Sequence, residues 1–91
     1  METGGAGTYI VAMSWQELRL KESSSIAAAA YDRRRRTLRI TFRPGRAAHR
    51  GGTYDYRPVP AAVVGEFLRA ESLGRFVNGR IKPAYAYARV R

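Results

Sequence analysis

The sequence predicts a small α+β domain, in which a three-stranded antiparallel meander carries one packed helix and is followed by a basic C-terminal extension. Two patterns lead to this prediction. Apolar and polar side chains alternate through "TLRITFR" at residues 37–43, as they do along a strand with one buried face. Four other apolar residues recur at the spacing of one helix face: Val63, Val64, Phe67 and Leu68. A chain of 91 residues fits one domain with a small core.

The first two strands are predicted to form a hairpin. The run "SIAAAAYD" at 25–32 and the strand at 37–43 flank four consecutive arginines, Arg33 to Arg36. A hairpin tip is solvated, so charge costs little there. "PGRAAHRGG" at 44–52 predicts a long flexible loop, and "TYDYR" then resumes the sheet as a third strand.

The helix is expected to begin near Pro60, because proline suits a first helical turn, and to end at Gly74. Beyond it the chain is predicted to be a basic tail with a turn at Asn78-Gly79. Tyr85 and Tyr87 alternate within this tail.

Residues 1–22 are predicted to be a flexible extension in front of a domain at 23–91. Ser14 and Glu17 stand at capping-box spacing, which predicts a short helix near 15–21. The alternation in "LRLK" leaves a strand as the alternative interpretation.

The strongest global feature is the charge. The chain has 17 basic against 7 acidic residues, a net charge of +10 and a pI of about 11.1. Residues 31–59 carry nine arginines against two aspartates, so the basic surface belongs to the sheet and its loops. Such a surface attracts polyanions, because each neutralised phosphate releases counterions. We therefore expect a non-enzymatic module that binds RNA or single-stranded DNA with little sequence preference.

The phosphate contacts are expected first at the hairpin tip and on the strand that leads from it, where guanidinium groups follow phosphates well. A second basic group follows later in the chain. The predicted nucleic-acid-binding residues are Arg33, Arg34, Arg35, Arg36, Arg39 and Arg43, then Arg57, Arg80 and Lys82, with Arg75 beside them. The simpler interpretation of the arginine run is a solvated turn.

Tyr54 and Tyr56 lie two residues apart, so they share one face of the third strand. If that face meets the helix, the rings are core residues whose hydroxyls reach outward. In the other register they lie beside Arg39 and Arg43 and form a platform on which bases stack. The first interpretation is preferred, because the opposite face would bury Asp55 and its neighbours.

Catalysis has little support in the sequence. The single histidine, His49, lies in the predicted loop, where a general base is hard to hold in place. Glu66 and Glu71 do not share a helix face, Asp32 and Asp55 are isolated, and the serines at 23–25 have no base. We expect no catalytic residue, no metal site and no cofactor. A small ribonuclease built on His49 is the enzymatic alternative.

The composition also leads to expectations about the compartment and the partners of the protein. The chain lacks cysteine and any apolar run of membrane-spanning length, so we expect a cytoplasmic protein without a membrane partner. Protein partners are the main alternative to nucleic acid. In that case the chain is a structural or assembly protein, for example a small phage component, whose arginines meet acidic protein surfaces. The oligomeric state is left open.

Several motifs occur in an order that resembles the KTSC family, small domains related to the C-terminus of some lysyl-tRNA synthetases. They are "SSSI" and "YD" within 23–32, "LRITF" at 38–42, "YDY" at 54–56, "VP" at 59–60 and "SLGRFVNGRIK" at 72–82. The last is similar to the family pattern S-x-G-x-x-x-N-x-x-I-[RK]. The resemblance implies RNA binding only as a suggestion made for the family. The long 44–52 connection and residues 1–22 depart from the pattern.

Overall fold

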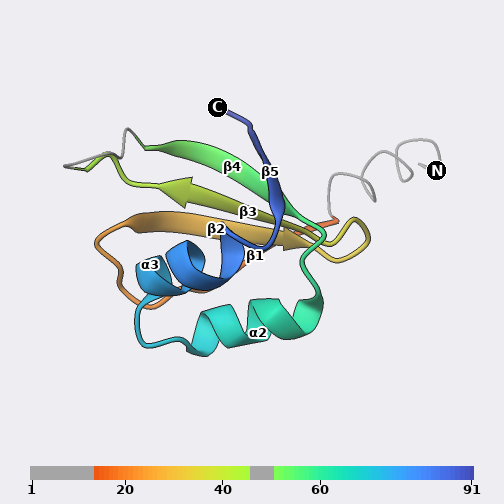
Figure 1. Ribbon diagram of the computed structural model, residues 1–91, viewed down its shortest axis with the longest axis horizontal. Helices are drawn as coiled ribbons and strands as arrows, with labels where there is room; N and C mark the ends of the chain where they lie inside the picture. The colour runs from red at the N-terminus through yellow and green to blue at the C-terminus, as the bar shows by residue number, and fades with distance from the viewer. Residues whose placement is uncertain (1–13, 46–50) are drawn as a thin grey trace, which may run out of the picture.

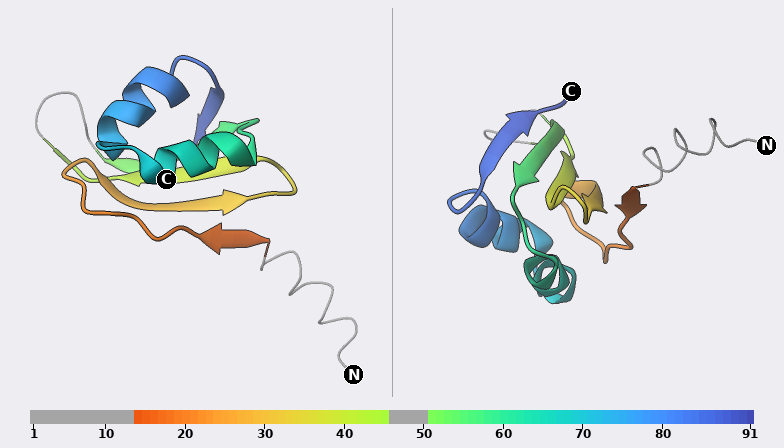
Figure 2. Two further views of the ribbon diagram at one scale, coloured as in Figure 1. Left: turned by 90° about the horizontal axis from the view of Figure 1, so that it is seen from below. Right: turned by 90° about the vertical axis from the view of Figure 1, so that its right-hand side faces the viewer.

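The computed structural model describes residues 14–45 and 51–91 and contains one five-stranded antiparallel sheet with its helices on one face (Figures 1 and 2). The strands lie across the sheet in chain order. They are β1 Trp15–Glu17, β2 Ile26–Asp32, β3 Thr37–Phe42, β4 Gly52–Arg57 and β5 Ala86–Arg89. The helices are α2 Ala61–Arg69, α3 Leu73–Phe76 and the π-helix η1 Val77–Ile81, which continues α3. The α+β class is confirmed, but the three-stranded meander with one helix is wrong.

The first additional strand is β1, where the sequence predicted a short helix near 15–21. β1 pairs antiparallel with β2 and places Trp15 opposite Asp32. The Ser14 hydroxyl donates to the Asp32 carboxylate at 3.2 Å, so it serves this pairing and not a helix cap. An isolated helical turn is costly to nucleate, whereas β2 offers a ready edge. Residues 15–17 are thus a strand of the sheet, whereas "LRLK" at 18–21, whose alternation suggested the strand alternative, lies after the end of β1.

The second additional strand is β5, formed by part of the expected tail. β5 pairs antiparallel with β4 and places Tyr87 opposite Tyr56. The Tyr87 ring centroid lies 6.0 Å from that of Tyr54 and 6.2 Å from that of Tyr56. The side-chain alternation around Tyr87 was therefore a strand signal. These ring contacts explain why the segment pairs with β4.

The helical segments also differ from prediction at their ends. α2 ends at Arg69, before Gly74, and α3 begins after Ser72, whose hydroxyl accepts a hydrogen bond from the Arg75 amide at 3.2 Å. Gly74 lies inside α3, where an added Cβ would collide with the Ser25 hydroxyl. Glycine at this position allows α3 to approach the chain just before β2.

The predicted turn at Asn78-Gly79 is wrong, because both residues lie within η1. Val77 and Ile81, four residues apart, are both fully buried. One continuous helical face therefore reaches the core through this segment, and its burial outweighs the local preference of Asn-Gly for a turn.

The core lies between the sheet and the helices. Its strand and helix residues include those predicted for β3 and α2, with further contributions from α3 and η1. The buried apolar residues are Ile26, Ala29, Tyr31, Leu38, Ile40, Phe42, Tyr56, Val59, Val64, Phe67, Leu73, Val77 and Ile81. Tyr56 is only 3% exposed, and Tyr54 packs against the core while staying partly exposed. The preferred interpretation of this tyrosine pair as core residues is thus confirmed most fully for Tyr56.

The connection between β3 and β4 is only partly described, since residues 46–50 lie outside the described residues, and His49 with them. At its end, Gly51 and Gly52 have φ values of 84° and 110°, which favour glycine. An added Cβ would lie 3.1 Å from the Pro44 nitrogen at Gly51, and 2.9 Å from the Arg89 guanidinium at Gly52. Both glycines are therefore needed where the chain enters β4. Within residues 14–45 and 51–91, no helix has the length and apolarity required to span a membrane.

The burial of Tyr56 predicts a loss of stability at high pH. Burial, helped by nearby Tyr54 and Tyr87, raises the pKa of Tyr56 from 10.0 to about 12. The folded state thus holds this proton more tightly than the unfolded chain. The stabilisation is complete below pH ~10 and is lost as the pH rises toward ~12, by about 2–3 kcal/mol in all. Thermal unfolding followed across this range should show the loss, and Tyr56→Phe should reduce it, while the part due to Tyr31, whose pKa burial also raises, should remain. An equally steep loss in Tyr56→Phe would contradict the assignment.

Candidate nucleic-acid interface

The hairpin tip presents four arginines in a row. Arg33 to Arg36 form the turn between β2 and β3, as predicted, and all four residues are exposed. The tip is thus the most concentrated positive charge among the described residues, at the corner of the sheet beside the end of β4 (Figure 1).

The backbone of this arginine tip is fixed from below by a buried carboxylate. Asp32 is fully buried, and its Oδ1 accepts hydrogen bonds from the amides of Arg34 at 3.0 Å and Arg35 at 3.4 Å. Its Oδ2 accepts from Ser14 and lies 3.7 Å from Nε of Arg35. Asp32 is therefore not isolated, as the sequence suggested, but organises the turn as an Asx motif.

Two further contacts hold the other end of the tip. The Arg36 carbonyl accepts a hydrogen bond from the Val59 amide at 2.7 Å, and the Thr37 hydroxyl donates to the Arg35 carbonyl at 3.2 Å. Arg36 has a φ of 53°, a left-handed conformation that costs an arginine about 1 kcal/mol. The surrounding bonds impose this geometry. The tip consequently presents four exposed arginines from a hydrogen-bonded backbone.

Arg57 adds to the same end of the sheet. Leu38 pairs with Tyr56, so the next residue of β4, Arg57, lies beside the start of β3 and the arginine tip. Arg57 is exposed. It therefore extends the positive surface toward the edge strand β5.

Arg39 lies on the uncovered face of the sheet but already has partners. Its Nε and Nη2 donate to the two carboxylate oxygens of Asp55 at 2.7 and 3.0 Å. The guanidinium also lies 4.2 Å from the ring centroid of Trp15. The hydrogen bond to Asp55 raises the pKa of Arg39. Asp55 is thus not isolated either, and the pair leaves the centre of this face nearly neutral.

The remaining predicted contacts lie away from the tip. Arg43 donates from Nε to the Ser23 carbonyl at 3.1 Å, beyond the far end of β3. Arg80 donates to Glu66 at 2.7 Å on the helical side. Lys82 has its Nζ 5.2 Å from the ring centroid of Phe42. The nine predicted residues therefore do not form one patch: the tip and Arg57 lie together, and these three lie elsewhere.

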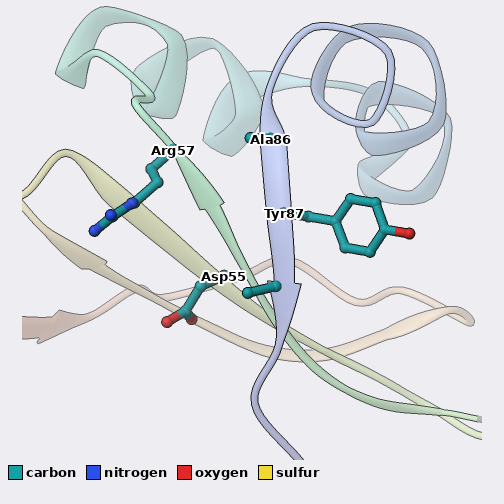
Figure 3. A pocket seen from close by; sticks show the side chains of 5 residues that line it. Asp55, Arg57, Ala86 and Tyr87 are labelled. Atoms are coloured by element: carbon teal, nitrogen blue, oxygen red, sulfur yellow. The ribbon is translucent and has the colours of Figure 1, made fainter.

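A hollow of about 350 Å³ lies next to Arg57, between β4 and β5. It is lined by Asp55, Arg57, Ala86, Tyr87 and Ala88. Figure 3 shows the Asp55 and Arg57 side chains on one side of the sheet, whereas the Tyr87 ring points away from them. The lining thus combines alanine methyl groups with one exposed guanidinium and one carboxylate, that of Asp55, which is paired with Arg39.

The sequence analysis missed Tyr87 as a candidate contact. Tyr87 is 66% exposed, although it is a large aromatic residue on a strand. Its alternation with Tyr85 was visible, but only pairing with β4 shows that one ring faces solvent beside two others. Tyr87 was therefore missed because this segment was assigned to a tail and not to a strand of the sheet.

Comparisons with known proteins agree with this architecture. The family model described as "KTSC domain" matches residues 22–85. A protein of Tsukamurella paurometabola is 45% identical over 64 residues, covering 70% of this chain and 87% of its own. A protein of Stutzerimonas stutzeri is 37% identical over 70 residues, covering 76% of this chain and 90% of its own.

A solved structure is similar to this chain in both fold and sequence. The crystal structure of a KTSC domain protein from Yersinia pestis matches with a TM-score of 0.71 and 34% identity, covering 85% of this chain and 99% of that one. The family match spans well over half of the sequence. β1 and β5 lie outside it, yet both pair within the same sheet. The chain belongs to the KTSC domain family.

Proposed function

We propose that this protein is a non-enzymatic module that binds the phosphates of RNA or single-stranded DNA without reading their sequence. The observation that carries the proposal is the arginine tip, which has four exposed guanidinium groups on a backbone fixed by buried Asp32. Guanidinium groups pair with phosphate oxygens through two parallel hydrogen bonds. An ordered backbone lowers the entropy lost when these contacts form.

The position of the charge favours single strands over duplexes. Proteins that read a duplex commonly insert a basic helix into the major groove. Here the proposed contacts, the arginine tip and Arg57, lie on a turn and a strand end, whereas the helical segments α2, α3 and η1 carry one arginine each, Arg69, Arg75 and Arg80. A turn and a sheet edge suit a flexible phosphate backbone. The cysteine-free sequence agrees with the cytoplasm as the proposed compartment.

The absence of catalysis is part of the proposal. The carboxylates that a hydrolytic site would use have structural partners: Asp32 organises the tip, Asp55 pairs with Arg39, and Glu66 pairs with Arg80. Among the described residues, no three metal-ligating side chains cluster together. We therefore expect binding without turnover, and His49→Ala should leave nuclease assays unchanged.

Replacing Arg33 to Arg36 by serine tests the proposal. All four side chains are exposed and the turn's hydrogen bonds use the backbone, so stability should change by less than about 1 kcal/mol. Binding of a labelled single-stranded oligonucleotide should weaken strongly. If the parent neutralises about six phosphates, log affinity against log salt should have a slope near −4, falling to about −1.4 in the variant if four of these contacts are lost. Fluorescence anisotropy over a salt series measures both quantities.

A charge-matched pair of double variants separates the site from net charge. Arg34 and Arg35 changed to serine should weaken binding much more than Arg69 and Arg75 changed to serine, since the second pair lies on the helices. Equal effects would mean that net charge alone drives binding. Failure of the parent to bind any oligonucleotide at low salt would reject the proposed function.

A further inference from the structure

A second exposed surface lies on the side of the sheet that carries the helices, at the β5 edge. Tyr54, Tyr56 and Tyr87, here called the tyrosine edge, share one face, because Tyr56 pairs with Tyr87 and Tyr54 lies two residues before Tyr56. Tyr56 is buried, Tyr54 is partly exposed, and Tyr87 is 66% exposed. The Tyr87 ring thus packs against the Tyr54 and Tyr56 rings on one side and is exposed to solvent on the other.

Tyr87 is too exposed for burial to explain why an aromatic side chain stands at this position. A ring that remains two-thirds exposed gains little from the hydrophobic effect, and an edge strand is usually protected by charged or small residues. Yet contacts with Tyr54 and Tyr56, at 6.0 and 6.2 Å between centroids, restrict its orientation. An exposed ring held in place is a suitable surface for stacking another planar group.

Positive charge lies beside the two rings that extend this cluster, Tyr54 and its neighbour Phe42. The Arg89 guanidinium carbon lies 5.7 Å from the Tyr54 ring centroid, and Lys82 Nζ lies 5.2 Å from that of Phe42. Phe42 and Tyr54 are themselves in edge contact at 5.8 Å. Aromatic surfaces flanked by cations are the arrangement with which proteins bind single strands, stacking the bases and pairing the phosphates.

The tyrosine edge is also adjacent to the arginine tip. Tyr56 is followed by Arg57, which lies beside the tip, and Arg57 pairs with Ala86 next to Tyr87. The Arg57 side chain and the Tyr87 ring lie on opposite faces of the sheet (Figure 3), so a single strand that contacts the tip and Arg57 passes around the exposed edge strand β5 within a few nucleotides. There its bases meet Tyr87.

We propose that Tyr87 stacks on a base of single-stranded nucleic acid, supported by Tyr54 and Tyr56, while Arg89 and Lys82 contact the neighbouring phosphates. This inference rests on the proposed function and adds to it a contact with the bases. This base contact would allow the protein to distinguish a nucleic acid from other polyanions of equal charge. The arginine tip alone does not make that distinction.

The experiment compares three probes by anisotropy: an oligothymidylate, an abasic oligonucleotide of the same length, and a polyglutamate of the same charge. The parent should prefer oligothymidylate to the abasic probe by roughly 5- to 150-fold, the range for stacking of about one base. Tyr87→Phe should keep this preference. Tyr87→Leu, which retains apolar bulk on β5, should lose it while binding the abasic probe as the parent does.

The outcomes separate this inference from the proposed function. Equal parent affinity for the oligothymidylate and the abasic probe, or an unchanged preference in Tyr87→Leu, would overturn base stacking and leave phosphate binding at the tip intact. Polyglutamate bound as tightly as oligothymidylate would overturn it in favour of an acidic protein partner. Binding of none of the probes would reject the proposed function and the inference together. Thermal melts of each variant check that the fold persists.

Discussion

Tyr56→Ala should lower the free energy of unfolding by about 3–5 kcal/mol, as truncation of a large aromatic ring in a core does. Tyr56 is 3% exposed, pairs with Leu38 on β3 and Tyr87 on β5, and belongs to the buried core on the sheet face that the helices cover. Its removal leaves a cavity between the sheet and the helices. Small domains have only about 5–15 kcal/mol of stability, so the variant should be close to unfolding at ordinary temperature.

Two variants test whether burial causes this loss. Tyr54→Ala truncates the same residue type on the same strand, but at a partly exposed position, so it should cost only about 1–2 kcal/mol. Tyr56→Phe keeps the ring and should remain close to the parent. Urea denaturation of the three variants gives the comparison. If Tyr54→Ala and Tyr56→Ala lost equal stability, the placement of Tyr56 in the core would be wrong.

The parts of the fold that the sequence predicted correctly have strong local patterns. Leu38, Ile40 and Phe42 alternate over a full strand, and all three are buried. Val64 and Phe67 likewise occupy the predicted helix face. Each pattern is long enough for burial to decide between a helix and a strand without knowledge of the partner.

The two edge strands could not be predicted in this way. β1 has three residues and β5 has four, and every residue of β5 is exposed. Such short segments acquire their structure from the neighbouring strand, which a local pattern does not contain. In "SWQE" the capping-box spacing was present, but pairing with β2 prevailed.

For the candidate interface, the sequence predicted which residues carry the positive charge but not how their side chains are paired and placed. The arginine tip was found because four adjacent arginines between two strands belong to a turn. Asp55 and Asp32 were considered isolated because Arg39 and Ser14 are distant from them in sequence, although the Arg34 and Arg35 amides that Asp32 also accepts are only two and three residues away. Cross-strand register brings them together, and register depends on the whole sheet. The same reason explains why Tyr87 was missed.

Asp32→Ala should lower the free energy of unfolding by about 2–3 kcal/mol, and the melting temperature by about 10–20 °C. The buried carboxylate accepts hydrogen bonds from Arg34, Arg35 and Ser14, and alanine would leave these donors without their acceptor. Asp32→Asn preserves the volume and the oxygen that receives the two amides. The Asp32→Asn variant should therefore lose much less unfolding free energy, since the Ser14 hydroxyl can accept a hydrogen bond from the new amide instead of donating one.

The same change connects the fold to the proposed function. Without Asp32 the arginines keep their charge, but the turn that presents them loses its internal acceptor. Under conditions where Asp32→Ala remains folded, oligonucleotide affinity should fall although only a negative charge has been removed, a change that by itself would strengthen attraction to phosphate. Hydrogen exchange at the Arg34 and Arg35 amides should accelerate in parallel. Stronger binding in Asp32→Ala would mean that net charge, and not the ordered tip, determines affinity, because the two explanations predict opposite signs for this variant.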